Sequence, residues 1–75
     1  MAKVLIVEDD FMLSLINKKS IEIIGHQVVG TVTNGADAII ETKKHKPDVV
    51  MMDLRLNGSL DGIDTMIEIA KFSNI

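Results

Sequence analysis

Residues 4–10, Val-Leu-Ile-Val-Glu-Asp-Asp, are an apolar run that ends abruptly in three acids. The apolar residues do not alternate with polar ones, a pattern typical of a strand that is buried on both faces of a sheet. A second run of this kind occupies residues 49–53, Val-Val-Met-Met-Asp, and it also ends in an acid. The two runs predict buried strands of one sheet, each followed by a carboxylate.

The segment between these runs begins with a helical pattern and continues with a short strand. Residues 28–32 are β-branched around Gly30, which predicts a strand and the close approach of another backbone at the glycine. Before that strand, Gly25 is suited to a left-handed helix end. The helix that it closes is predicted from apolar residues at helical spacing, namely Leu13, Ile16, Ile23 and Ile24.

Two further helices are predicted in the same way. Asn34, with Asp37 three residues later, has the spacing of a helix N-cap and its partner. Pro47 cannot lie inside that helix and biases Lys46 towards extended geometry. After the turn-forming residues 57–62, a third helix is predicted with one apolar face. The residues of that face are Ile63, Met66, Ile67 and Ala70.

The predicted order is strand, helix, strand, helix, strand, helix, which indicates the α/β class. Such alternation predicts parallel strands joined by right-handed crossovers, with helices on both faces of a doubly wound sheet. Nothing in residues 1–75 repeats and no linker divides them, so we expect one domain. Ligands of such sheets bind beyond the carboxyl ends of the strands.

Composition narrows the class of protein further. The 75 residues are 47% hydrophobic and contain no cysteine, so neither a disulfide nor a thiolate metal site stabilises so small a core. A net charge of −3 argues against direct nucleic-acid binding by phosphate neutralisation. No run approaches the roughly 20 apolar residues of a membrane span, so we expect a cytoplasmic protein. Four methionines are assigned to core packing: Met12, Met51, Met52 and Met66.

The acids at the strand ends are the candidate site. If the strands at residues 4–7 and 49–52 are neighbours, about 4.8 Å apart, then Glu8, Asp9 and Asp53 converge. Oxygen ligands in this number suit Mg²⁺, beside which Asp53 could attack phosphorus as a nucleophile. An acid at a strand end often only opens a loop or caps a helix, and spacing alone leaves both interpretations open.

Four strings in this order and spacing resemble the receiver domain of two-component response regulators, a CheY-like module with the flavodoxin-like fold. They are VLIVEDD, GADAI, PDVVMMDLRL and DGID. The resemblance implies that Glu8 and Asp9 serve a Mg²⁺ site, with Mn²⁺ as the alternative ion, Asp9 as the direct ligand and Glu8 acting through water. It implies further that Asp53 is the phosphoacceptor and metal ligand, and that the backbone carbonyl of Arg55 completes the site.

The resemblance also implies how much of the family's domain is present. Family members have five strands in the order 2-1-3-4-5, and residues 1–75 correspond to the amino-terminal portion, with strand order 2-1-3. A Ser/Thr after the fourth strand and a Lys after the fifth contact the phosphoryl group in that family, so we expect poor or absent phosphorylation of this chain. The implied role is a phosphoacceptor signalling domain rather than an enzyme. Its implied partner is a sensor histidine kinase or a phosphotransfer protein.

Three alternatives stay open. The first is a non-catalytic interaction module, in which the unpaired edge of the strand at residues 49–52 joins two copies into a homodimer. The second is a haloacid-dehalogenase type of enzyme, although Leu54-Arg55 lacks the second acid that this class places two residues after its nucleophile. The third is a flavin or cobalamin binder, although neither a phosphate-cradling loop nor an Asp-x-His-x-x-Gly string is present.

Overall fold

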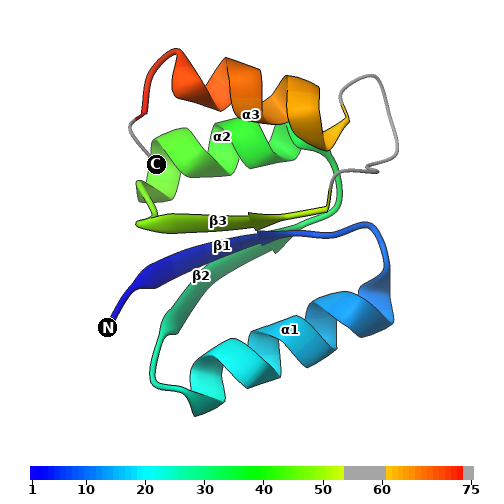
Figure 1. Ribbon diagram of the computed structural model, residues 1–75, viewed down its shortest axis with the longest axis vertical. Coiled ribbons are helices and arrows are strands. Elements are labelled where there is room, and N and C mark those ends of the chain that lie inside the picture. Colours follow the sequence, from blue (N-terminus) through cyan, green and yellow to red (C-terminus); the bar gives the residue numbers. More distant parts are fainter. Residues whose placement is uncertain (54–60, 74–75) are drawn as a thin grey trace.

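The computed structural model describes residues 1–53 and 61–73. These residues form three strands and three helices in strict alternation, as the sequence predicts (Figure 1). The bounds are β1 Lys3–Val7, α1 Phe11–Ile23, β2 Gln27–Val32, α2 Gly35–His45, β3 Val49–Met52 and α3 Gly62–Ala70. The predicted turn at residues 57–60 lies outside the described residues.

The strands form one parallel sheet in the order β2-β1-β3. In the ladder between β1 and β3, Val4 lies opposite Val49 and Val7 lies opposite Met52. The central strand is the most buried element, because it is flanked on both sides and its last four residues are at most 5% exposed. The predicted strand order 2-1-3 is confirmed.

Gly30 allows close packing between β2 and β1, although not the backbone approach that we predicted. A Cβ atom at this position would lie 3.3 Å from Cδ1 of Leu5, so a side chain is its neighbour. The ladder is irregular at the same place, since Val4 lies opposite Val28 while Leu5 lies opposite Gly30. The glycine therefore makes room for the leucine at the centre of the sheet.

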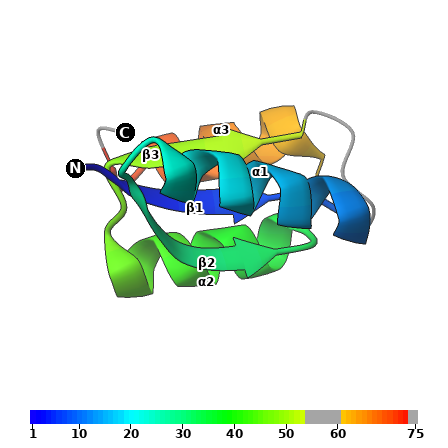
Figure 2. The ribbon, with the colours of Figure 1, turned by 90° about the horizontal axis from the view of Figure 1, so that it is seen from below.

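Helices cover both faces of the sheet: α1 lies on one face, and α2 and α3 lie together on the other (Figures 1 and 2). Alternate residues of β1 supply the two cores. Leu5 and Val7 pack with Ala38 of α2, whereas Val4 and Ile6 pack with Ile21 of α1. The doubly wound layout predicted from the alternation of strands and helices is confirmed.

The residues predicted at the helix ends occupy those places, with one exception. Asp37 donates its N–H to Oδ1 of Asn34 at 2.9 Å, and Gly25 closes α1 with a φ of +93°. Lys46 is the exception, because it ends α2 in the left-handed conformation with a φ of 48° rather than in extended geometry. Its N–H donates to the carbonyl of Thr42 at 3.0 Å, so closing the helix outweighs the bias from the following proline.

The apolar residues from which α1 and α3 were predicted are exposed rather than buried. In α3 the buried residues are Gly62, Thr65 and Ile69, while Ile63 and Met66 are 55% and 54% exposed. α3 packs against α2 through this mostly small stripe, so its larger apolar side chains point elsewhere. Of the apolar residues that predicted α1, all four are exposed: Leu13, Ile16, Ile23 and Ile24.

The methionines assigned to the core follow the same trend. Met12 is 62% exposed on α1, Met66 is 54% exposed on α3, and Met51 is 40% exposed on β3. Only Met52 packs against the core cluster of Leu5. No helix within residues 1–53 and 61–73 has both the length and the apolar character needed to cross a bilayer.

Candidate functional site

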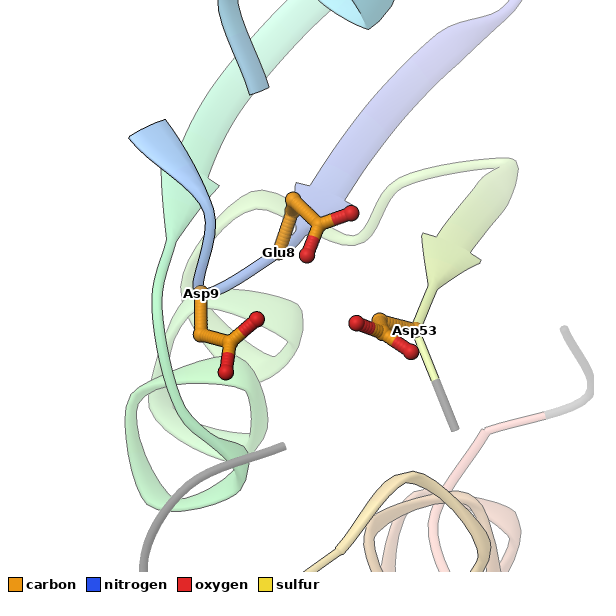
Figure 3. A group of neighbouring side chains, drawn as sticks. All are labelled: Glu8, Asp9 and Asp53. Atoms are coloured by element: carbon orange, nitrogen blue, oxygen red, sulfur yellow. The ribbon is translucent and has the colours of Figure 1, made fainter. Parts of the chain in front are cut away.

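Three carboxylates converge where β1 and β3 end. Glu8 and Asp9 follow β1, and Asp53 follows β3, the neighbouring strand. The ladder continues past the strand ends, since Asp53 donates its N–H to the carbonyl of Val7 at 3.0 Å. Carboxylate oxygens of the three acids lie within 4.8 Å of one another, and the side chains point into the same space (Figure 3). The convergence predicted from the sequence is therefore present.

β2, the strand on the other side of β1, also fixes the position of Glu8. Its N–H donates to the carbonyl of Val32 at 2.9 Å, so the end of β2 holds this residue in line with β1. Glu8 is only 9% exposed, whereas Asp9 and Asp53 are half-buried. The site therefore combines one buried carboxylate with two that are accessible to solvent.

Burial raises the pKa of the Glu8 carboxyl above its ordinary value of 4.5. The N–H of Asp10, which donates to Oε2 of Glu8 at 3.3 Å, acts in the opposite direction and lowers the pKa. Hydrogen bonding with Asp53 and Asp9, and the negative charge of Asp53, raise the pKa further. Glu8 is therefore held in its neutral form more strongly in the folded chain than in the unfolded one.

This shift predicts how the stability of the metal-free protein depends on pH. A raised folded-state pKa contributes stability that is fully present below about pH 4.5 and is lost as the pH rises through the folded-state value. We therefore expect Glu8→Gln, which stays neutral, to raise the Tm at pH 7.5 in EDTA. The rise should shrink as the pH falls towards 5.

Thermal melting by circular dichroism between pH 5 and 8 measures this difference. Glu22→Gln is the matched control, because Glu22 is an exposed acid of α1 outside the carboxylate group. A Glu8→Gln gain that does not vary with pH would show that packing, rather than charge, causes it.

The remaining site residues are placed as follows. Arg55, whose carbonyl the family resemblance assigns to the metal, lies outside the described residues. Asp10, to which we gave no role, caps α1, because its Oδ1 accepts the N–H of Leu13 at 3.1 Å. An acid directly before a helical pattern is a known N-cap signal, so the sequence did contain this information. By capping α1, Asp10 fixes the point where the chain leaves the site.

A hollow of about 150 Å³ lies beside the cluster, between the start of α1 and the end of β2. Glu8 and Asp9 form part of its wall, and Lys18 of α1 lines it too. Thr31 and Thr33 line it from the β2 side. Sequence reasoning missed these polar neighbours, because they become adjacent to the acids only through the packing of α1 on β2.

The donor set fits a small divalent cation. All three groups offer carboxylate oxygens, the hard ligands that Mg²⁺ and Mn²⁺ accept, and no sulfur or imidazole is among them. Burial is the main cause of the raised pKa of Glu8, and the negative charge of Asp53 adds a smaller contribution that a bound cation would offset. Glu8, Asp9 and Asp53 are thus suited to hold a divalent cation and to present an aspartate beside it.

Comparison with known proteins gives a consistent result. A sequence model of the response regulator receiver domain matches residues 4–74. The chemotaxis protein CheY of Thermotoga maritima is 39% identical over 69 residues, which cover 92% of this chain and 57% of that relative. The chain thus spans little more than half of that relative's length.

Solved structures agree with the sequence matches. The signal receiver domain of a modulated diguanylate cyclase from Desulfovibrio desulfuricans superposes with a TM-score of 0.94 at 32% identity, covering 100% of this chain and 60% of that one. PhyR of Bartonella quintana, an anti-anti-sigma factor solved in complex with the anti-sigma factor NepR, superposes with a TM-score of 0.91 at 28% identity. That match covers 99% of this chain and 30% of PhyR.

Proposed function

We propose, from the premise that this chain belongs to the family of response regulator receiver domains, that it is a phosphoacceptor module of two-component signalling. Asp53 takes a phosphoryl group from the phosphohistidine of a sensor histidine kinase or a phosphotransfer protein. The observation that carries this proposal is the convergence of Asp53 with Glu8 and Asp9 at the carboxyl end of the sheet. The module acts as a signalling partner rather than as an enzyme of its own.

Charge governs the chemistry at this site. Glu8, Asp9, Asp53 and the backbone carbonyl of Arg55 would hold Mg²⁺ or Mn²⁺, which when bound supplies neutralisation of the phosphoryl oxygens. An Asp53 carboxylate oxygen forms the new bond to phosphorus while the bond from phosphorus to the donor imidazole nitrogen breaks. The electron pair of that bond returns to the imidazole, and Asp53 becomes an acyl phosphate.

Phosphorylation of a polypeptide limited to residues 1–75 should nevertheless be weak. The Ser/Thr and Lys that the family uses to contact the phosphoryl oxygens are expected beyond the region that residues 1–75 match. Loss of one preorganised donor of this kind costs about 10²–10³ in rate at other enzyme sites. In a longer parent protein, the new charge on Asp53 would shift a neighbouring surface that other proteins read. We place the module in the cytoplasm. We expect no direct contact with nucleic acid, because its net charge is −3.

Acetyl phosphate labelling, followed by intact-mass measurement and peptide mapping, tests the role of Asp53. We expect slow labelling that leaves most chains unmodified, that requires Mg²⁺, and that is lost in Asp53→Asn. Asp48→Asn should label like the wild type, because Asp48 is an exposed acid at the opposite end of the same strand. Label that persists in Asp53→Asn would contradict the assigned acceptor, and rapid complete labelling would contradict the expected weakness.

A second candidate function is self-association without chemistry. β3 pairs only with β1 within the described residues, and its Val49 and Met51 are 46% and 40% exposed. An unpaired apolar strand edge is a template for another strand. We therefore add a homodimer joined through β3 as the alternative role of the chain.

A further inference from the structure

The side chain of His26 binds the backbone that leads into β1. The N–H of Ala2 donates to Nδ1 of His26 at 2.9 Å, and the carbonyl of Ala2 accepts the N–H of Gln27 at 2.9 Å. Two consecutive residues at the beginning of β2 therefore bind both main-chain groups of Ala2. This contact lies at the end of the sheet opposite the carboxylates, where the chain returns from α1 to β2 (Figure 1).

The turn that carries His26 fixes the position of the imidazole ring. Gly25 turns the chain after α1 with a φ of +93°, and the N–H of His26 donates to the carbonyl of Ile21 at 3.1 Å. His26 is half-buried there. Ala2 packs against the core cluster that contains Val4 and Ile21. The ring thus connects the last turn of α1 with the residues that precede β1.

The hydrogen bond also determines which ring nitrogen can take up a proton. In a neutral imidazole, one nitrogen carries a hydrogen and the other is an acceptor. Because Nδ1 of His26 accepts the N–H of Ala2, the hydrogen of the neutral ring lies on Nε2. A second proton can therefore bind only at Nδ1. Protonation turns this acceptor into a donor, so that two N–H groups face each other and the hydrogen bond is lost.

Charged groups on the neighbouring elements do not replace this bond. They are the amino group of Met1, the ammonium of Lys3 at the start of β1 and the carboxylate of Glu22 on the last turn of α1. Within residues 1–53 and 61–73, the side chain of His26 forms its hydrogen bond with Ala2 and no ion pair. Nothing in that part of the chain therefore compensates for the bond when the ring becomes charged.

We infer that His26 is a pH-sensitive switch at the amino end of the sheet. Histidine is the side chain that ordinarily changes its charge between pH 5 and 8. The bond to Ala2 is present while His26 is neutral, and it is lost as the pH falls through this range and a proton from solvent binds Nδ1. Ala2 then separates from the start of β2, and the N–H of Gln27 loses its partner. This inference goes beyond the phosphoacceptor role and does not rest on it.

Hydrogen exchange of the Gln27 amide, followed by NMR at pH 5.5 and 7.5 and corrected for the intrinsic effect of pH, tests the switch. We expect the wild-type protection factor to be about fivefold lower at pH 5.5, the factor that matches the loss of one typical hydrogen bond. His26→Asn offers a carbonyl oxygen in place of Nδ1 and does not titrate, so its protection factor should be the same at both pH values. His26→Phe offers no acceptor and should give the low value at both.

The ring itself provides a second readout. Nitrogen NMR signals of His26 should show the form with hydrogen on Nε2 at pH 7.5 and the doubly protonated form at pH 5.5. His45→Gln is the matched control, because His45 pairs with Glu41 within α2, and it should keep the wild-type response. Asp53→Asn should keep it too, which separates this test from that of the acceptor.

Three results would each overturn the switch. The first is a wild-type protection factor of Gln27 that does not change between the two pH values. The second is an equal change in His26→Asn, which would mean that another group causes the response. The third is a neutral ring that carries its hydrogen on Nδ1.

Discussion

Leu5→Ala is expected to lower the free energy of unfolding by about 2–5 kcal/mol. Leu5 is fully buried in the central strand, packs with Val7 and Ala38, and fills the space that Gly30 leaves open. Removing a buried leucine side chain costs about 2–5 kcal/mol, through lost burial and the cavity left behind. A domain of this length has a total stability of only about 4–11 kcal/mol at the usual value per residue. A single substitution can therefore remove most of it.

Urea denaturation followed by circular dichroism measures this loss. Ile40→Ala provides the control, because Ile40 loses a similar volume from an exposed site on α2, and its stability should stay within about 0.5 kcal/mol of the wild type. The urea dependence should keep its slope for both variants if they unfold in two states. A Leu5→Ala loss below about 1 kcal/mol would contradict the central place that we assign to this residue.

The strands could be predicted from the sequence because burial on both faces leaves little freedom of composition. Residues 4–7 and 49–52 are continuous apolar runs, and both form parallel strands of the sheet. The two layers of helices follow from the alternation of elements, whereas the strand order 2-1-3 was implied by the family resemblance. The convergence of Glu8, Asp9 and Asp53 then requires only that two neighbouring parallel strands end together.

The helix faces could not be predicted in this way, because exposed apolar residues are common and do not show which side a helix buries. α3 buries Thr65 completely, with its hydroxyl donating to the carbonyl of Asp61 at 2.7 Å, while Ile63 stays exposed. A polar side chain can lie in the core when it has a hydrogen-bond partner there. A prediction based only on the positions of apolar residues therefore misses such a residue. The conformation of Lys46 was missed for a related reason, since the rule for residues before proline ignores the bond that closes the helix.

Asp9→Asn is expected to remove most of the stabilisation that we expect Mg²⁺ to give the wild-type chain. An ion that binds only where the three carboxylates converge stabilises the folded state, by about 2.7 kcal/mol at 100 times its dissociation constant. That gain corresponds to a rise in Tm of roughly 10–20 °C for a domain of this size. Replacing one of few oxygen ligands by a neutral amide should weaken Mg²⁺ binding at least 100-fold, beyond the 10–100-fold typical for outer-shell changes. The Tm in Mg²⁺ should then lie within about 3 °C of the Tm in EDTA, because an ion present at its dissociation constant adds only about 0.4 kcal/mol.

The change in stability that Asp9→Asn causes in EDTA shows whether Asp9 is a metal ligand or a residue that supports the fold. Asp9 is one of three carboxylates within 4.8 Å of one another, so Asp9→Asn should leave the metal-free domain as stable as the wild type or more stable. Asp48→Asn removes the same charge at the far end of β3 and should keep the full response to Mg²⁺. Mn²⁺ gives a second readout, since it should broaden the amide signals around Asp9 and Asp53 in the wild type but not in Asp9→Asn. Equal losses of stability in Mg²⁺ and in EDTA would mean that Asp9 supports the fold and not an ion, and the proposed acceptor chemistry at Asp53 would lose its metal.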